Sequence, residues 1–155
     1  MAQAAYAGDL QAHEASGSHS ARLSAENARH IRDSYRLIEP VDALVATLFF
    51  RRLNDTAPEV RPFLAGCEAV HRERLRVALG LAVASVDRFG DIVSPLRLLG
   101  ARYRALGVTE YHYGAVAEAF MWTLRQSLGA HWTAEVEHAW TALFTLIAET
   151  MTASD

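Results

Sequence analysis

The stretch of sequence that decides the fold is Leu99-Gly100-Ala101-Arg102-Tyr103-Arg104-Ala105-Leu106-Gly107-Val108. It is typical of the end of a helix, because Gly107 can adopt the left-handed conformation that closes a helix. Leu96, Leu99, Tyr103 and Leu106 recur at helical spacing, so they share one apolar face. The neighbouring arginines lie off that face. We therefore expect Tyr103 to point toward the interior.

Further helices precede and follow this stretch, and Ser, Thr, Pro and Gly residues mark their ends. No alternating strand pattern and no internal repeat interrupts them. The sequence predicts an all-α domain over residues 22–155, preceded by a leader or flexible tail over residues 1–21 that lacks apolar periodicity. The expected helices run from Ser24 to about Ile38, Pro40 to Leu53, Glu68 to about Arg88, Ser94 to Gly107, Thr109 to about Leu128 and Thr133 to about Met151, with a short segment over Glu59 to Leu64.

Composition limits the function. A chain of 155 residues with 51% hydrophobic residues is expected to form one buried core. The net charge of -3 offers no basic field for nucleic acid, and all fifteen cationic residues are arginines, so no lysine is present to form a Schiff base. No apolar run is long enough to span a membrane. Cys67 is the only cysteine, which favours a reducing cytoplasm.

A second stripe lies on the expected helix from Glu68. His71, Leu75, Ala78, Ala82 and Val86 fall on one helical face, and the two alanines leave room either for a flat ligand or for close helix packing. Helical periodicity alone does not separate these two interpretations.

These segments together resemble bacterial single-domain globins and flavohaemoglobin-type globins. The resemblance is carried by the decisive stretch above and by Pro58-Glu59-Val60-Arg61-Pro62-Phe63, His71 with Leu75, His112-Tyr113, Leu128-Gly129, Trp132-Thr133 and Ala139-Trp140. It implies a globin fold of six to eight helices around a tetrapyrrole pocket. In this comparison His71 is similar to the distal residue, and Phe63 (or Leu64) to the pocket phenylalanine.

The position that normally carries the iron-binding histidine holds a tyrosine. In the globins that the chain resembles, the distal and proximal positions are thirty-two residues apart, and thirty-two residues after His71 stands Tyr103. A phenol must lose a proton before it binds iron well, and its anion prefers ferric iron. Reversible oxygen carriage is therefore not expected, and neither is tight haem ligation by Tyr103, because Arg102 and Arg104 point away from it.

We expect a linear bilin, biliverdin or a related compound, to occupy the pocket instead of haem. The sequence also resembles, in its lost proximal histidine, biliverdin-binding globins associated with bilin biosynthesis. Arginines at the pocket rim, Arg72, Arg76, Arg97 and Arg102, would hold the propionates. The expected ligand-binding residues are Tyr103, His71, Phe50, Phe63, Leu75, Leu99, Arg72, Arg102, Val108 and Tyr113, with no metal bound.

Alternatives remain open. One is a haem globin ligated by Tyr103 or His71, with oxygen, nitric oxide or peroxide chemistry. Another is a ligand-free signalling globin in which Tyr103 is a buried core residue. Attachment of a chromophore to Cys67 is conceivable, but a lone cysteine is more often small, buried and inert.

No catalytic motif accompanies these residues, so we expect a protein that is not an enzyme unless haem is bound. His112 is expected to open a helix, and His131 and His138 to lie at the surface, like His13 and His19 in the leader. A homodimer through the last two helices is a further expectation, since the residues Tyr113, Phe120, Trp122 and Trp140 suit either a dimer surface or a core.

Overall fold

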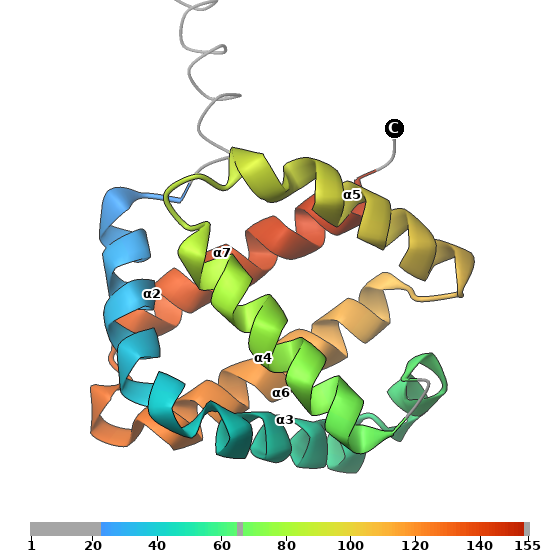
Figure 1. Ribbon diagram of the computed structural model, residues 1–155, viewed down its shortest axis with the longest axis horizontal. Helices are drawn as coiled ribbons and strands as arrows, with labels where there is room; N and C mark the ends of the chain where they lie inside the picture. The colour runs from blue at the N-terminus through green and yellow to red at the C-terminus, as the bar shows by residue number, and fades with distance from the viewer. Residues whose placement is uncertain (1–22, 65–66, 154–155) are drawn as a thin grey trace, which may run out of the picture.

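The computed structural model describes residues 23–64 and 67–153 (Figure 1). This part of the chain is entirely helical, as the sequence predicts. Its α-helices are α2 (Ala25–Ile38), α3 (Asp42–Thr56), α4 (Glu68–Ala84), α5 (Gly90–Ala105), α6 (Glu110–Leu128) and α7 (Ala134–Thr152), and the short 3-10 helices are η1 (Glu39–Val41), η2 (Pro58–Phe63) and η3 (Gly129–His131). The predicted leader over residues 1–21 lies outside the described residues.

Most helix ends fall where the sequence places them, because each has a local cause. The Ser24 side chain accepts a hydrogen bond from the backbone N–H of Asn27 at 3.0 Å, and Thr133 accepts one from Val136 at 3.2 Å. Gly107 has a φ of 94° after the end of α5, and Gly129 has a φ of 54° after α6. The side chains of Ser24 and Thr133 accept hydrogen bonds from backbone N–H groups in the first turn of their helices. The positive φ angles of Gly107 and Gly129 turn the chain away from the helix that precedes each of them.

Three predicted boundaries are wrong. The helix expected to end at Leu53 continues to Thr56, whose hydroxyl donates to the carbonyl of Arg52. The helix from Glu68 ends at Ala84 rather than near Arg88. The next helix begins at Gly90, four residues before Ser94, and takes Pro95 into its second turn, where proline removes only one hydrogen bond near the helix start.

The core lies where α2, α3, α6 and α7 pack together. α2 packs along α7 and α3 along α6, while the indole N–H of Trp140 on α7 donates to the hydroxyl of Ser34 on α2 at 2.9 Å. Trp140 and Ile31 are completely buried. The Ser34 hydroxyl itself donates to the backbone carbonyl of His30 at 2.6 Å, so this buried polar cluster is satisfied.

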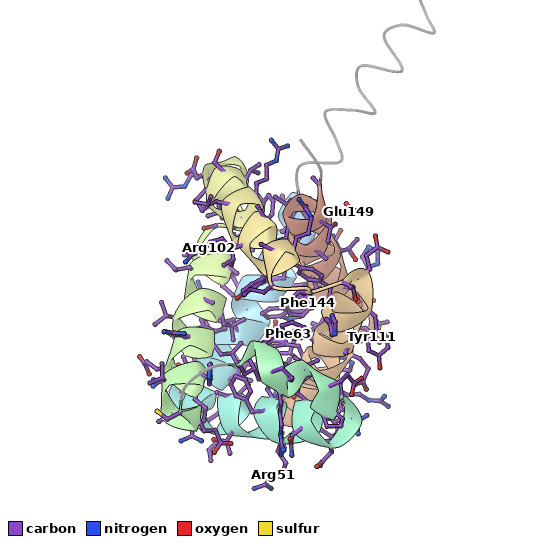
Figure 2. All side chains as sticks on the ribbon, turned by 90° about the vertical axis from the view of Figure 1, so that its right-hand side faces the viewer. Arg51, Phe63, Arg102, Tyr111, Phe144 and Glu149 are labelled. Atoms are coloured by element: carbon purple, nitrogen blue, oxygen red, sulfur yellow. The ribbon has the colours of Figure 1, made fainter. Side chains whose placement is uncertain are left out.

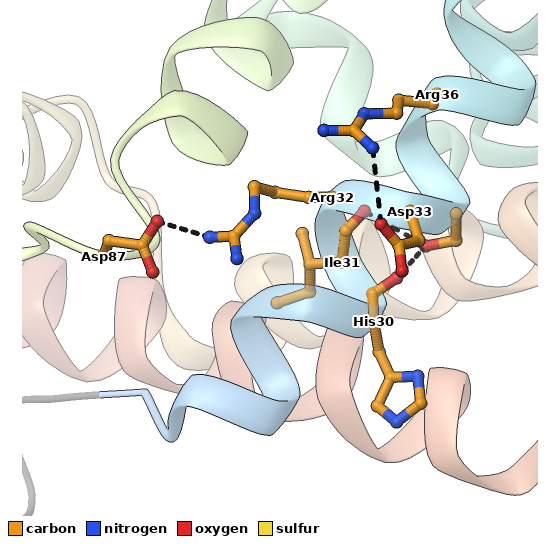
Figure 3. Close-up of polar contacts among 7 residues, drawn as sticks. His30, Ile31, Arg32, Asp33, Arg36 and Asp87 are labelled. Carbon is orange, nitrogen blue, oxygen red and sulfur yellow. Dashed lines mark hydrogen bonds and ion pairs between the residues drawn. The ribbon is translucent and has the colours of Figure 1, made fainter.

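α4 and α5 are held to this core in different ways. α4 packs on α3, and α5 packs on α7 through Gly100, where an added Cβ would lie 1.9 Å from the carbonyl oxygen of Met151. Arg32 on α2 forms an ion pair with Asp87 in the connection between α4 and α5 (Figure 3). α4 and α5 do not pack extensively against each other, and in Figure 1 they form a V that is closed at this connection.

Candidate functional site

The candidate site lies between α4 and α5, at the open end of the V. We define the α4–α5 site by His71 and Leu75 on α4 and by Leu99 and Tyr103 on α5. Figure 2 shows the molecule from this open side, with Phe63 and Phe144 near the middle and Arg102 projecting from α5 on the side of α4. The distal and proximal positions inferred from the sequence thus lie on two different helices, His71 on α4 and Tyr103 on α5.

His71 provides the only polar atom of the α4 wall that is buried without a partner among the residues described. Its Nε2 is inaccessible to solvent and has no hydrogen-bond partner there. The His71 ring centroid lies 6.3 Å from that of Phe50 on α3, so the imidazole is packed against an apolar neighbour. A buried polar atom without a partner costs free energy, and such an atom requires an explanation.

The α5 wall is apolar but uncovered. Leu99 is 36% exposed and Tyr103 38% exposed, and Gly100 is the only buried residue of α5. Tyr103 forms no hydrogen bond with the described residues, so the alternative in which it is a buried core tyrosine with a backbone or carboxyl partner is wrong. Leu96 at the start of the predicted apolar face packs against the core, but Leu99, Tyr103 and Leu106 further along it are exposed.

Tyr103 lies close to a second phenol, that of Tyr113 on α6. Burial raises the pKa of Tyr113, and the neighbouring Tyr103 raises it further, while Arg104 acts in the opposite direction. Arg104 donates to the carbonyls of Thr152 at 3.5 Å and Ala153 at 3.3 Å, beyond the end of α7. As predicted, the guanidinium of Arg104 is therefore not held against Tyr103.

The α4 stripe predicted from periodicity is only partly correct. Leu75 is partly buried against the core and Val86, beyond the end of the helix, is buried, but Ala78 is exposed, and the buried residues of α4 itself are Leu79 and Val83. The core face of α4 therefore lies beside the predicted stripe, on the side of the helix that packs against α3. Ala78 and Ala82 do not serve as a tight helix-packing surface.

Phe63 and His112 form the floor of the site near η2. Their ring centroids are 4.7 Å apart in an edge-on arrangement. The Nδ1 atom of His112 accepts a hydrogen bond from the backbone N–H of Thr109 at 2.9 Å and completes a capping box at the start of α6. His112 therefore opens a helix, as predicted, and its contact with Phe63 is an additional role that the sequence did not indicate.

The predicted arginine rim is reduced by ion pairs. Arg76 pairs with Asp42 at 2.9 Å and with Glu73 at 2.8 Å, so it is already neutralised and the prediction that it binds a propionate is not supported. Arg72 lies 3.6 Å from Glu68. Arg97 and Arg102 are exposed and form no ion pair with the described residues, so they remain the better candidates.

Val108 and Tyr113 also line a second space, behind α5. This cavity of ≈ 190 Å³ lies where α5 and α6 meet the end of α7 and includes Gly100, Arg104 and Met151 in its lining. Val108 and Tyr113 are both partly buried, and the cavity that they line does not include His71 or Tyr103.

Several other predictions concern residues outside the site. His131 and His138 are exposed, as expected. Cys67 is exposed at the start of α4, so the interpretation of it as a buried cysteine is wrong. Phe120 and Trp140 are buried in the core and cannot form a dimer surface, whereas the homodimer itself stays a prediction. No group of metal-ligating side chains occurs among the described residues, and none of their helices is long and apolar enough to cross a membrane.

The described part of the chain thus combines an all-helical fold with a histidine on α4 and an exposed apolar face on α5. The comparisons identify the family: a family model described as Globin matches residues 65–151, and the chain belongs to the globin family. This match includes α4, α5, α6 and nearly all of α7, and therefore both walls of the site.

Individual relatives are neuroglobins. The chain is 29% identical to neuroglobin of Danio rerio over 119 residues, which cover 76% of this chain and 72% of that protein. It is 23% identical to neuroglobin of Chaenocephalus aceratus over 144 residues, or 84% and 91% of the two chains. Neuroglobin-1 of Oncorhynchus mykiss is 27% identical over 81 residues, about half of each chain. These names do not point to a bacterial, flavohaemoglobin-type or bilin-associated globin.

Proposed function

We propose that this globin binds a tetrapyrrole in the α4–α5 site and that haem is its ligand. The observation that carries the proposal is the uncovered apolar face of α5 together with the buried, unpartnered Nε2 of His71 on α4. A flat, mostly apolar molecule would cover the first and supply a partner for the second.

The residues present fit haem on the α4 side. Phe50 and Leu75 offer apolar contact beside His71, and neutral imidazole is a ligand of both ferrous and ferric haem iron. Bound haem would supply iron as a binding centre for small molecules. Arg102 and Arg97 would reach its propionates, because guanidinium groups bind carboxylates with paired hydrogen bonds.

A bilin is the second candidate, and the tyrosine at the proximal position favours it. A linear tetrapyrrole without iron needs no ligand from α5, and its pyrrole N–H groups would donate to the Nε2 atom of His71. Haem remains the first proposal because the resemblance to globins implies it, whereas none of the named relatives indicates a bilin.

A ligand-free signalling globin is the least supported of the three candidates. It would leave Leu99, Tyr103 and Leu106 facing water along one helix, together with an imidazole nitrogen that is buried without a partner. That the protein has no catalytic activity of its own, and that it acts in the cytoplasm, stay predictions.

A competition experiment tests the proposal. The full chain is purified without ligand, mixed with equimolar haemin and biliverdin, separated from free ligand by gel filtration and measured by absorption spectroscopy. A Soret band at one haem per chain supports haem, and broad near-ultraviolet and red bands would identify a bilin instead. A colourless protein would overturn tetrapyrrole binding and leave the ligand-free alternative.

A further inference from the structure

The two halves of α4 are attached to the rest of the molecule to different degrees. The second half contains the two buried residues of this helix, Leu79 and Val83. The connection that follows adds Val86 and Phe89 to the core. The first half, residues 68–78, contains no buried residue. Because burial of apolar side chains is the main stabilising contribution to a packed helix, the first half of α4 is held less firmly than the second.

Both ends of this first half are weak points of the helix. Cys67, which precedes α4, makes no side-chain capping hydrogen bond, so the first backbone N–H groups of the helix lack the kind of partner that Ser24 gives to α2. At the other end stands Gly80, and glycine inside a helix is less favourable than alanine. α5 does not pack extensively against α4, so α3 is the main support of this helix.

A buried atom in the first half of α4 opposes its packing on α3. The Nε2 atom of His71 is inaccessible to solvent and has no hydrogen-bond partner in the described parts of the chain, and the His71 ring lies beside Phe50 on α3. If residues 68–78 move away from α3, water reaches this atom and replaces the missing partner. The closed arrangement therefore carries a free-energy cost that an open arrangement does not have.

An ion pair acts in the opposite direction. The Nε atom of Arg76 donates to Oδ1 of Asp42, the first residue of α3, at 2.9 Å, and the Asp42 side chain is only 19% exposed. Arg76 also pairs with Glu73, but both residues belong to α4, so this contact does not tie the helix to α3. Among the ion pairs of the described residues, only that of Arg76 with Asp42 joins residues 68–78 to another helix.

We propose that residues 68–78 form a lid that unfolds locally, away from α3 and as far as Gly80, and that the ion pair of Arg76 with Asp42 is the latch that keeps it closed. The lid carries His71, so its opening uncovers the α4 wall of the α4–α5 site. Entry of a ligand past the open lid rests on the proposed function, whereas the opening itself does not.

Hydrogen–deuterium exchange of the full chain without ligand, followed by mass spectrometry, measures the opening. We expect the amides of residues 72–78, which have hydrogen bonds within the helix, to exchange at least about tenfold faster in the wild type than those of α7, after correction for intrinsic rates. Arg76→Gln removes the latch. It should speed the exchange of residues 72–78 by about a further fivefold and leave α7 unchanged.

Arg32→Gln is the matched control for the latch. It removes another arginine–aspartate ion pair, the one between α2 and Asp87 in the connection behind α4. Exchange of residues 72–78 should then stay within about twofold of the wild type. Asp42→Asn removes the latch from the α3 side, and it should add nothing further to the effect of Arg76→Gln, because both variants break the same contact. Circular dichroism verifies that each variant is folded.

His71→Leu should change the exchange in the opposite direction. This variant removes the unpartnered nitrogen and keeps an apolar side chain beside Phe50, so we expect residues 72–78 to exchange at least about fivefold more slowly. His131→Leu, at an exposed histidine outside the lid, should leave their exchange unchanged. Unchanged or faster exchange in His71→Leu would show that the buried nitrogen does not favour opening.

Two further results would overturn the lid. One is exchange of residues 72–78 as slow as that of α7 in the wild type. The other is an equal increase in Arg76→Gln and Arg32→Gln, or an increase in all helices at once, which would indicate global unfolding. A colourless protein whose residues 72–78 exchange fast contradicts only the proposed function. A haem-binding protein whose residues 72–78 exchange slowly without ligand contradicts only the lid.

Discussion

The α2–α7 half of the molecule and its α4–α5 half consist of similar helices but differ in how well their side chains are buried and hydrogen-bonded. In the first, Trp140 is completely buried and its one polar atom is satisfied by Ser34. In the second, Leu99, Tyr103 and Leu106 are exposed, and the buried Nε2 atom of His71 has no partner among the described residues. The first half is satisfied by its own side chains, and in the proposed function a bound tetrapyrrole would cover the exposed face of the second.

Removing the central side chain of the first half should give the largest effect. Trp140→Ala deletes a fully buried indole and leaves the Ser34 hydroxyl without its donor, so we expect a loss of about 3–5 kcal/mol in the free energy of unfolding. Urea unfolding followed by circular dichroism measures this loss. Trp140→Phe should lose less, since most of the ring remains; an equal loss would mean that the hydrogen bond matters more than the packing.

Gly100 joins the two halves, and substituting it should give the next largest effect. A Cβ at Gly100 would lie 1.9 Å from the carbonyl oxygen of Met151, so Gly100→Ala must push α5 away from α7 at a cost of about 1–3 kcal/mol. Gly114→Ala on α6 is the matched control, because nothing lies within 4 Å of its added Cβ. It should be neutral or stabilising by up to about 1 kcal/mol. Thermal unfolding of both variants measures these two changes in stability.

A polar side chain on the exposed apolar face of α5 should weaken tetrapyrrole binding while leaving the stability of the apo-protein nearly unchanged. Leu99→Gln is expected to change the stability of the apo-protein by no more than about 0.5 kcal/mol, because Leu99 is already 36% exposed. It should weaken tetrapyrrole binding by roughly tenfold, since a polar group would then face the ring. Titration of haemin followed by absorption measures the affinity.

Leu98→Gln serves as the control for that substitution. Leu98 is 66% exposed and lies off the Leu99–Tyr103 face, so both stability and ligand affinity should stay near those of the wild type. If Leu98→Gln weakens binding as much as Leu99→Gln does, the ligand lies elsewhere on α5.

The same contrast explains what could be predicted from the sequence. Helix caps at Ser24 and Thr133 and the stop at Gly107 are local signals, so those boundaries were correct. The count of thirty-two residues from His71 to Tyr103 comes from the resemblance to globins, and the role of both residues in ligand binding stays a prediction. Pro95, read as a helix start, is instead an internal residue, because tertiary packing of Ile92 and Val93 against the core keeps the preceding turn helical.

Other features depend on contacts between residues distant in the sequence. The exposure of Tyr103 follows from which helices cover α5, and helical periodicity only predicts that one face is apolar. The ion pair of Arg76 with Asp42 depends on the placement of α3 beside α4. The packing of His112 on Phe63 joins η2 to α6, and no spacing within either segment indicates it.

A surface contact near the floor of the site should give the smallest effect and a distinct dependence on pH. The hydroxyl of Tyr111 donates to Glu59 at 2.5 Å, and this hydrogen bond, helped by His112, holds the pKa of Glu59 below its ordinary value of 4.5. A carboxyl group whose pKa is lower in the folded protein stabilises the fold above the unfolded-state pKa, and this contribution disappears as the pH falls through the folded-state pKa.

Tyr111→Phe removes the donor and should therefore lower the Tm slightly at pH 7, by at most about 2 °C, because both side chains are exposed to solvent. Below pH 4.5 the difference between wild type and variant should shrink toward zero, since protonated Glu59 no longer gains from the contact in either protein. Differential scanning calorimetry between pH 3 and pH 7 measures this trend. A difference that stays the same between pH 3 and pH 7 would contradict a contribution from the ionised Glu59 carboxylate.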